Sequence, residues 1–211
     1  MQSRLSIPLV LAALAGAASA QTVQFNALIE KVPTDPCTGF EFGVESTDVL
    51  LGSNAVDLAP LVDSIVLLKG NVVALSPCPT LSVVVESVAK PTATLEVCGT
   101  VAIGCPVQFQ IGPPTISANF LAVSVQPQIF APLQDPLGVL FLDSPFFVIG
   151  SAGAGGIIDV TIPGNAPLGV EVTFQALHQE IGPIQGPGWL SNPIRRQLVL
   201  AFFCSDPTVC F

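Results

Sequence analysis

The chain has 211 residues, of which 50% are apolar and only 10% are charged, and this composition excludes an intrinsically disordered protein. Acidic residues outnumber basic ones by 15 to 6, and the net charge of −9 argues against sequence-independent binding of nucleic acid or anionic lipid, which uses clustered Lys and Arg. The 18 Gly and 20 Pro disfavour long helices and indicate a β-rich globular chain.

Residues 1–20 have the pattern of a secretory signal peptide. The basic residue Arg4 precedes an apolar run that ends at Leu14, and Ala18-Ser19-Ala20 supplies a small-residue cleavage site. An uncleaved membrane anchor is the alternative, but the apolar run is shorter than the roughly 20 residues that a spanning helix needs. We therefore expect cleavage before Gln21, a secreted or cell-envelope location, and no transmembrane segment in the mature chain.

Six cysteines in an exported chain predict three disulfides. Many pairings are possible, and we favour the pairing of sequence neighbours, which closes one long loop and two short ones. The predicted pairs are Cys37–Cys78, Cys98–Cys105 and Cys204–Cys210. A zinc site is disfavoured because the chain has no Cys-x-x-Cys pair and only one histidine.

Residues 21–97 predict a small OB-like β-barrel. Runs rich in Val, Ile, Leu, Phe and Thr predict strands at 23–29, 40–44, 48–51, 64–75, 81–88 and 94–97. The first two runs alternate with a period of two, so one face of each strand should be buried. Asp57 is expected to cap a helical turn over 57–62. Three strands, a helical turn and two more strands is the order of an OB-type barrel.

Residues 56–72 also resemble the later part of OB-fold domains from bacterial secreted proteins. In those domains a short turn leads into a strand with the pattern V-x-L-x-G-x-V, although here Asp63-Ser64 replaces the usual glycine. The resemblance implies the fold alone. OB grooves bind their ligands through aromatic and basic side chains, and this half has no Trp or Tyr and only Lys31, Lys69 and Lys90 as bases.

Residues 98–203 predict an antiparallel β-sandwich. Short strands separated by Pro- and Gly-rich turns are typical of that fold, and they are expected at 107–111, 117–125, 138–142, 146–149, 157–162, 170–177 and 197–203. The glycine-rich residues 153–156 precede a strand pattern instead of a helix, so they predict a hairpin turn and not a phosphate-binding loop. Residues 204–211 are expected to form a tail closed by its own disulfide. The predicted fold class is therefore all-β, with a small OB-like barrel followed by a β-sandwich.

The second half carries three short patterns in order: a Gly-Gly strand ending at Ile162-Pro163, then Gln175-Ala176, then Leu190-Ser191-Asn192. Over residues 100–200 they resemble a C-terminal β-sandwich module that recurs in secreted proteins of planctomycete-type bacteria. One departure is Val170-Glu171-Val172, where that module prefers an apolar L-T-L. The resemblance implies a secreted domain with a structural or adhesive role and assigns no catalytic residue.

The residue types that hydrolytic enzymes need are scarce in this chain. His178 is the only histidine, and it follows a predicted strand beside Gln179 and Glu180, as is typical of a surface side chain without a catalytic role. No G-x-S-x-G nucleophile motif is present. We therefore expect no enzyme activity and no cofactor. We also expect that replacing His178 by alanine leaves the fold and the biological role unchanged.

The carboxylates are the remaining candidates for chemistry, namely Asp48, Asp57, Asp63, Asp135, Asp143 and Asp159. A glycosidase needs two facing acids in a groove with sugar-stacking aromatic rings, and the chain has Trp189 alone and no Tyr. A weak calcium site on acidic loops stays open as an alternative. Otherwise these acids are expected to be turn and cap residues that keep an apolar chain soluble.

Two functions from different classes remain open. The first is a secreted, non-catalytic β-protein with a structural, adhesive or surface-assembly role, whose partners would be other cell-surface proteins. The alternative is an extracellular module that binds a glycan or another small ligand. An exposed apolar patch spanning both units would favour assembly. A concave pocket lined by Trp189 or several Phe, with convergent polar groups, would favour ligand binding.

Overall fold

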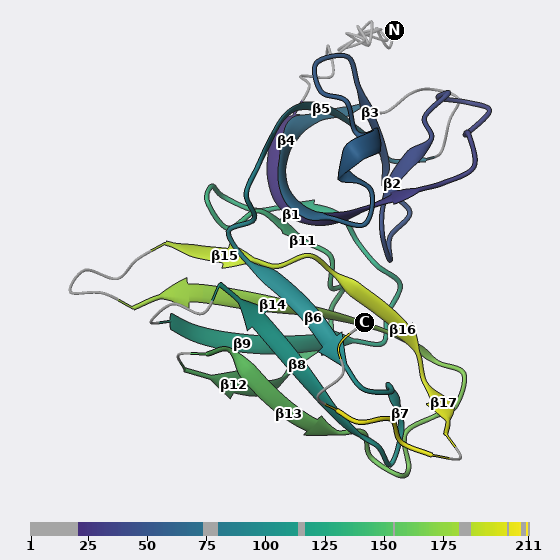
Figure 1. The fold of residues 1–211 in the computed structure, drawn as a ribbon, viewed down its shortest axis with the longest axis vertical. Helices are drawn as coiled ribbons and strands as arrows, with labels where there is room; N and C mark the ends of the chain where they lie inside the picture. Colours follow the sequence, from purple (N-terminus) through teal and green to yellow (C-terminus); the bar gives the residue numbers. More distant parts are fainter. Residues whose placement is uncertain are drawn as a thin grey trace, which may run out of the picture.

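A computed structural model describes residues 21–73, 80–113, 117–153, 155–181, 187–201, 203–207 and 210. The expected signal peptide at 1–20 and Cys78 lie outside these ranges. The predicted fold class is confirmed, since a closed barrel is followed by further sheets that are almost entirely antiparallel (Figure 1). In the part of the chain that is described, no helix is long and apolar enough to cross a membrane.

The barrel has five strands, and they are β1 (Gln21–Lys31), β2 (Phe42–Val44), β3 (Leu50–Ser53), β4 (Ile65–Val73) and β5 (Ser82–Ala89). The strand order is β1-β2-β3-β5-β4, and β4 pairs back with β1 to close the barrel. Only the β3–β5 pair is parallel. A 3-10 turn, Ala59–Leu61, links β3 to β4, and the Asp57 carboxylate accepts a hydrogen bond from the Ala59 amide at 3.1 Å. The predicted order of strands and turn is thus confirmed.

The interior of the barrel follows from the alternation in β1. Val23, Phe25, Ala27 and Ile29 all point into the barrel core and are buried, as the period of two predicts. Asn26 points outward yet is only 2% exposed. The outer face of β1 is therefore covered at Asn26 by residues from the second half of the chain.

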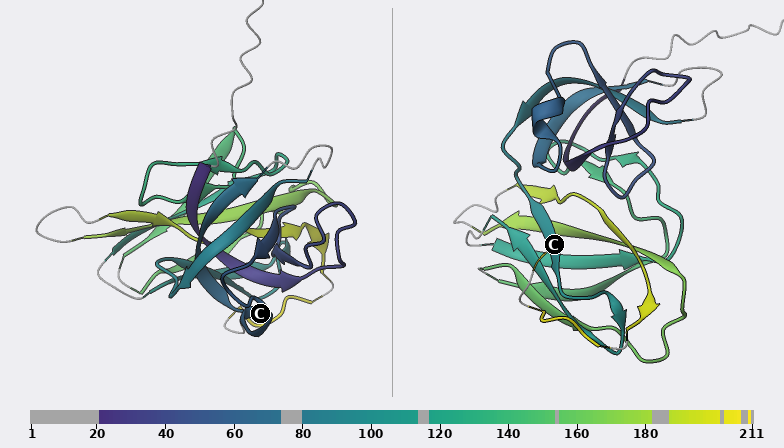
Figure 2. Two further views of the ribbon diagram at one scale, coloured as in Figure 1. Left: turned by 90° about the horizontal axis from the view of Figure 1, so that it is seen from above. Right: turned by 45° about the vertical axis from the view of Figure 1, so that its right-hand side comes forward.

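Two stacked sheets form the sandwich. One contains β12 (Phe146–Ala152), β9 (Ser117–Ser124), β14 (Glu171–Glu180), β15 (Gly188–Leu190) and β16 (Ile194–Gln197), and the other contains β13 (Ile157–Thr161), β8 (Pro106–Gly112) and β6 (Thr94–Cys98). Figure 2 shows them layered below the barrel in the right-hand view. Apolar side chains from both sheets meet between them, for example Phe109 and Phe174 at 4.8 Å between ring centroids.

Two sandwich connections differ from the predictions. The strand at 94–98 belongs to the sandwich, because β6 pairs with β8 and not with a barrel strand. The residues around Gly155 and Gly156 do not form a hairpin, because β12 and β13 lie in different sheets. At Gly156 the backbone has a φ of 59°, and a Cβ atom there would collide with the carbonyl oxygen of Ile111. Glycine is required at this crossing between the sheets because of that close approach.

A long connection of the sandwich returns to the barrel and completes its core. It contains the short pair β10 (Ala131–Pro132) and β11 (Val139–Leu140). Phe130 and Phe141 from this connection contact Phe25 of β1 edge to face, at centroid distances of 5.8 and 6.0 Å. The strand predicted at 138–142 therefore exists in part, but it packs on the barrel.

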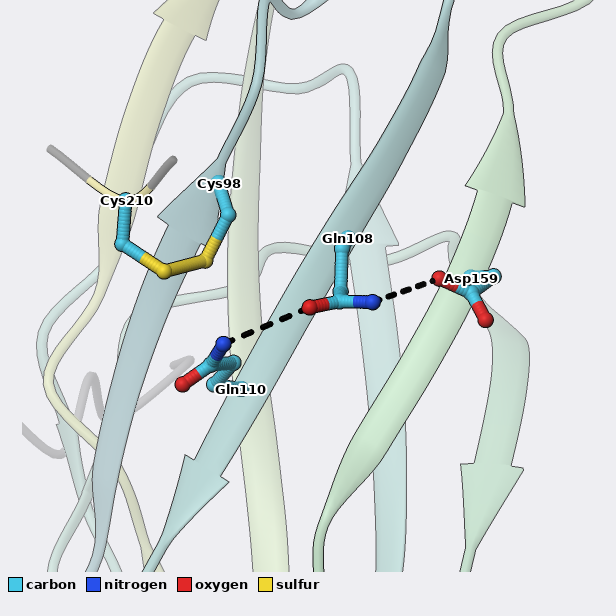
Figure 3. Close-up of a disulfide and its surroundings, with 5 residues drawn as sticks. All are labelled: Cys98, Gln108, Gln110, Asp159 and Cys210. Atoms are coloured by element: carbon cyan, nitrogen blue, oxygen red, sulfur yellow. Dashed lines mark hydrogen bonds between the residues drawn. A yellow bond between two sulfur atoms is a disulfide. The ribbon is translucent and has the colours of Figure 1, made fainter. Parts of the chain in front are cut away.

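The predicted pairing of sequence neighbours is wrong for two of the three disulfides. Cys98 is bonded to Cys210, and Cys105 is bonded to Cys204. Cys98 lies opposite Gln108 in the register of β6 and β8, on the outer face of that sheet, where Gln110, Gln108 and Asp159 form a row of hydrogen bonds (Figure 3). The C-terminal tail is thus tied across this sheet instead of being closed on itself. Cys37 is also disulfide-bonded.

A second short pair, β7 (Ala102–Ile103) and β17 (Val199–Leu200), is parallel and lies near these disulfides. The strand predicted at 197–203 is therefore present only at its centre. Strand β15 and most of β16 lie in residues 188–196, for which no strand was predicted.

Candidate functional site

Four of the carboxylates that were candidates for chemistry have a local structural contact, and they are Asp48, Asp57, Asp143 and Asp159. Asp143 accepts a hydrogen bond from the Ser144 amide at 2.7 Å, and Asp159 accepts one from Gln108 at 3.0 Å. Asp48 pairs with Arg195 at 3.7 Å and is 90% exposed, so this ion pair contributes little stability. In the described ranges, no group of three His, Cys, Asp or Glu side chains is placed to hold a metal ion.

The prediction that His178 is a surface residue is wrong. His178 is 0% exposed and lies in β14, where its Nδ1 is 2.7 Å from Oδ1 of Asn119 on β9. The Trp189 ring stacks beside it at a centroid distance of 6.2 Å. The polar neighbours Gln179 and Glu180 suggested exposure, but β9 and β15 flank β14 on both sides. Replacing His178 by alanine would therefore open a cavity and leave Asn119 without this partner.

The hydrogen bonds of Asn119 fix the protonation of the ring. Its Nδ2 donates to Ser117 Oγ at 3.0 Å and to the Gly153 carbonyl at 3.1 Å, so its Oδ1 must be the atom that faces His178. The neutral imidazole accordingly carries its proton on Nδ1 and donates it to Asn119. Burial lowers the pKa of His178 below its ordinary value, and the Glu180 carboxylate acts in the opposite direction.

This burial predicts a pH dependence of stability. In the unfolded chain, His178 is protonated as the pH falls through about 6.5, whereas burial opposes its protonation in the folded chain. The contribution of the neutral ring to the free energy of unfolding is therefore fully present above that pH and is lost as the pH falls below it. We expect the free energy of unfolding to fall more on mild acidification in the wild type than in His178→Gln. Two other groups have shifted pKa values: burial raises the pKa of Glu30, and hydrogen bonds from Thr38 lower the pKa of Asp35. Both groups are present in the wild type and in the variant, so they do not cause the difference between the two proteins. Denaturant titrations at several pH values measure the difference, and equal slopes would contradict it.

A cluster of buried amides joins the barrel to the sandwich, and sequence reasoning gave these residues no role. Gln175 of β14 donates to the carbonyls of Val139 and Ser191 at 2.9 and 3.0 Å and accepts from the Phe141 amide at 3.0 Å. Ser191 Oγ accepts from the Ala176 amide at 2.9 Å. Gln175 thus holds the connection that completes the barrel core onto the sandwich.

Asn192 and Asn26 extend the same cluster. The Asn192 side chain accepts from the Leu95 amide and donates to the Leu95 carbonyl, at 2.9 and 3.0 Å, as a neighbouring strand would. Asn26 of β1 donates to the Leu190 carbonyl at 2.8 Å. Gln175, Leu190, Ser191 and Asn192 are the positions of the Gln-Ala and Leu-Ser-Asn patterns, so in this chain those patterns have a structural role.

A cavity of about 390 Å³ lies beside this junction. Its lining includes Thr47 and Thr80 from the barrel half and Gln128, Phe130 and Phe141 from the long connection. The volume is within the range of small-ligand sites, and two aromatic rings meet polar groups there. Binding of a glycan or another small ligand therefore stays an alternative prediction, and this cavity is the candidate binding site.

The exposed apolar side chains are distributed unequally. Within the described ranges, the large hydrophobic residues that are exposed all lie between Phe120 and Phe203, and the barrel strands have none. They gather most densely on β12, where Phe146, Phe147 and Val148 are 45%, 59% and 61% exposed. Three consecutive exposed apolar residues on one strand form a dense apolar surface patch among the described residues.

The chain was compared with known proteins in three ways, and no family model, no curated protein and no solved structure matches it. The resemblance to planctomycete-type secreted proteins therefore stays a prediction.

Proposed function

We propose that this protein is an exported, non-catalytic β-protein whose role is structural, and that it works by self-association through its sandwich. The observation that carries the proposal is the confinement of exposed large hydrophobic side chains to the sandwich half. Scattered surface hydrophobics need no explanation, but a dense set on one strand marks an interaction site. The barrel strands carry none of the described exposed large hydrophobic residues, so an apolar patch spanning both units is not seen, and the proposed contact uses the sandwich alone.

Two features support an extracytoplasmic location. Two described disulfides tie the C-terminal tail to the sandwich, and such bonds persist in oxidising compartments. The first twenty residues carry the signal-peptide pattern. The non-catalytic part of the proposal is supported by His178, which is enclosed between strands and hydrogen-bonded to Asn119.

The proposal predicts concentration-dependent association of the mature chain. Sedimentation velocity over a wide range of protein concentrations should show a monomer that converts to larger species as concentration rises. Because each copy carries a net negative charge, added salt should screen their repulsion and strengthen an association driven by apolar burial. A protein that stays monomeric at every concentration and salt level would contradict the proposed function.

A further inference from the structure

The strand β12 has an unpaired side. It is the terminal strand of the order β12-β9-β14-β15, and no described strand forms a ladder with its outer side. Its nearest neighbour there is β13, which belongs to the other sheet and pairs with β8 (Figure 1). An edge of this kind presents backbone N–H and C=O groups that can accept another strand.

The side chains of β12 are apolar on both faces. Register with β9 places Phe146 and Val148 opposite Ser124 and Ala122, on the outer face of the sheet. Phe147 lies opposite Val123, on the face that looks toward the sandwich core, yet it is 59% exposed because it lies at the margin. A strand added to this edge would therefore meet apolar side chains above and below the new ladder.

The length of the free edge is limited. A bulge interrupts the β12 register between Val148 and Gly150. A Cβ atom at Gly150 would overlap the Ile158 side chain of β13, so the two sheets approach closely from there on. The part of β12 that is open to a partner is consequently its beginning, at residues 146–148.

We infer that the occupant of this edge is the same strand of a second copy, paired antiparallel about a two-fold axis. The inference rests on the proposed self-association and names its surface. Residues 146–152 contain no charged side chain, so two copies of β12 bring no like charges together, although the whole chain is strongly acidic. Antiparallel pairing of identical strands is the self-complementary arrangement that a two-fold interface requires.

Substitution of Phe147 tests the inference. In the mature, disulfide-bonded chain, Phe147→Lys would place two ammonium groups close together across the new ladder and remove apolar burial, and it should weaken association about tenfold or more. Val148→Lys, at a residue that is 61% exposed, should act in the same way from the opposite face. Leu168→Lys is the matched control, since Leu168 is 54% exposed but lies outside β12. Sedimentation velocity measures all four proteins, and circular dichroism confirms that each is folded.

The outcomes separate this inference from the proposed function. Association that is lost in both β12 variants and kept in Leu168→Lys supports the edge pairing. Association that persists in Phe147→Lys and Val148→Lys, or that Leu168→Lys weakens equally, overturns the edge pairing but leaves self-association standing. A wild type that does not associate contradicts both.

Discussion

Replacing Gln175 with alanine is expected to lower the free energy of unfolding by about 3–5 kcal/mol. The amide makes three hydrogen bonds, and its partners Val139, Phe141 and Ser191 are at most 1% exposed. Water cannot reach the three backbone groups that bond to Gln175, so the substitution leaves each of them buried without a hydrogen-bond partner, which destabilises the fold. The same change also releases the connection that supplies Phe141 to the barrel core.

Gln110 offers a matched control for Gln175. It is also a strand glutamine, but its one described side-chain hydrogen bond, to Gln108 at 3.3 Å, lies on the outer face of its sheet. Gln110→Ala should change the free energy of unfolding by less than about 0.5 kcal/mol. Denaturant unfolding of the two variants measures the difference. If Gln175→Ala cost no more than Gln110→Ala, the amide cluster would not be what joins the two units.

Removing both described disulfides should cost more than the sum of removing each alone. Cys98–Cys210 and Cys105–Cys204 have sequence separations of 112 and 99, so one loop is nested in the other and they differ by only 13 residues. While one bond remains, the other closes only a short additional loop, worth about 3 kcal/mol. Loss of both also frees the long loop, which is worth about 5 kcal/mol more, and we expect a total of about 8 kcal/mol.

Alanine replacement of each cysteine pair, alone and together, gives the comparison. Guanidinium unfolding measures stability, and mass spectrometry verifies that the remaining disulfides are formed. A combined loss equal to or smaller than the sum of the two single losses would contradict the nested arrangement.

The local elements of the fold were predictable because their signals are local. The alternation of Val23, Phe25 and Ala27 is enough to place a half-buried strand, and the order of strands around the 57–62 turn indicated the barrel. The assignment of β6 failed for a physical reason. A five-residue strand has the same pattern in a barrel as in a sandwich, and only its partner, β8, decides where it belongs.

The contacts between distant segments were not predictable from these patterns. Sequence proximity favoured Cys98–Cys105, but the tail crosses the outer face of β6 and brings Cys210 to Cys98. Burial of His178 depends likewise on Asn119, which is 59 residues away on β9, and on Trp189 of the neighbouring strand β15. For Gln175 and Asn192 a signal was present in the Gln-Ala and Leu-Ser-Asn patterns. Their spacing, however, does not reveal that they bind backbone groups of Val139 and Leu95.

Hydrogen–deuterium exchange of the mature chain tests self-association through β12 most directly. Exchange of the amides in residues 146–148 is measured at protein concentrations below and above the association range. Edge pairing predicts that these amides become protected as concentration rises, while the exposed amides around Leu168 do not change. Association without added protection in residues 146–148, or protection that arises on the barrel instead, would contradict the account.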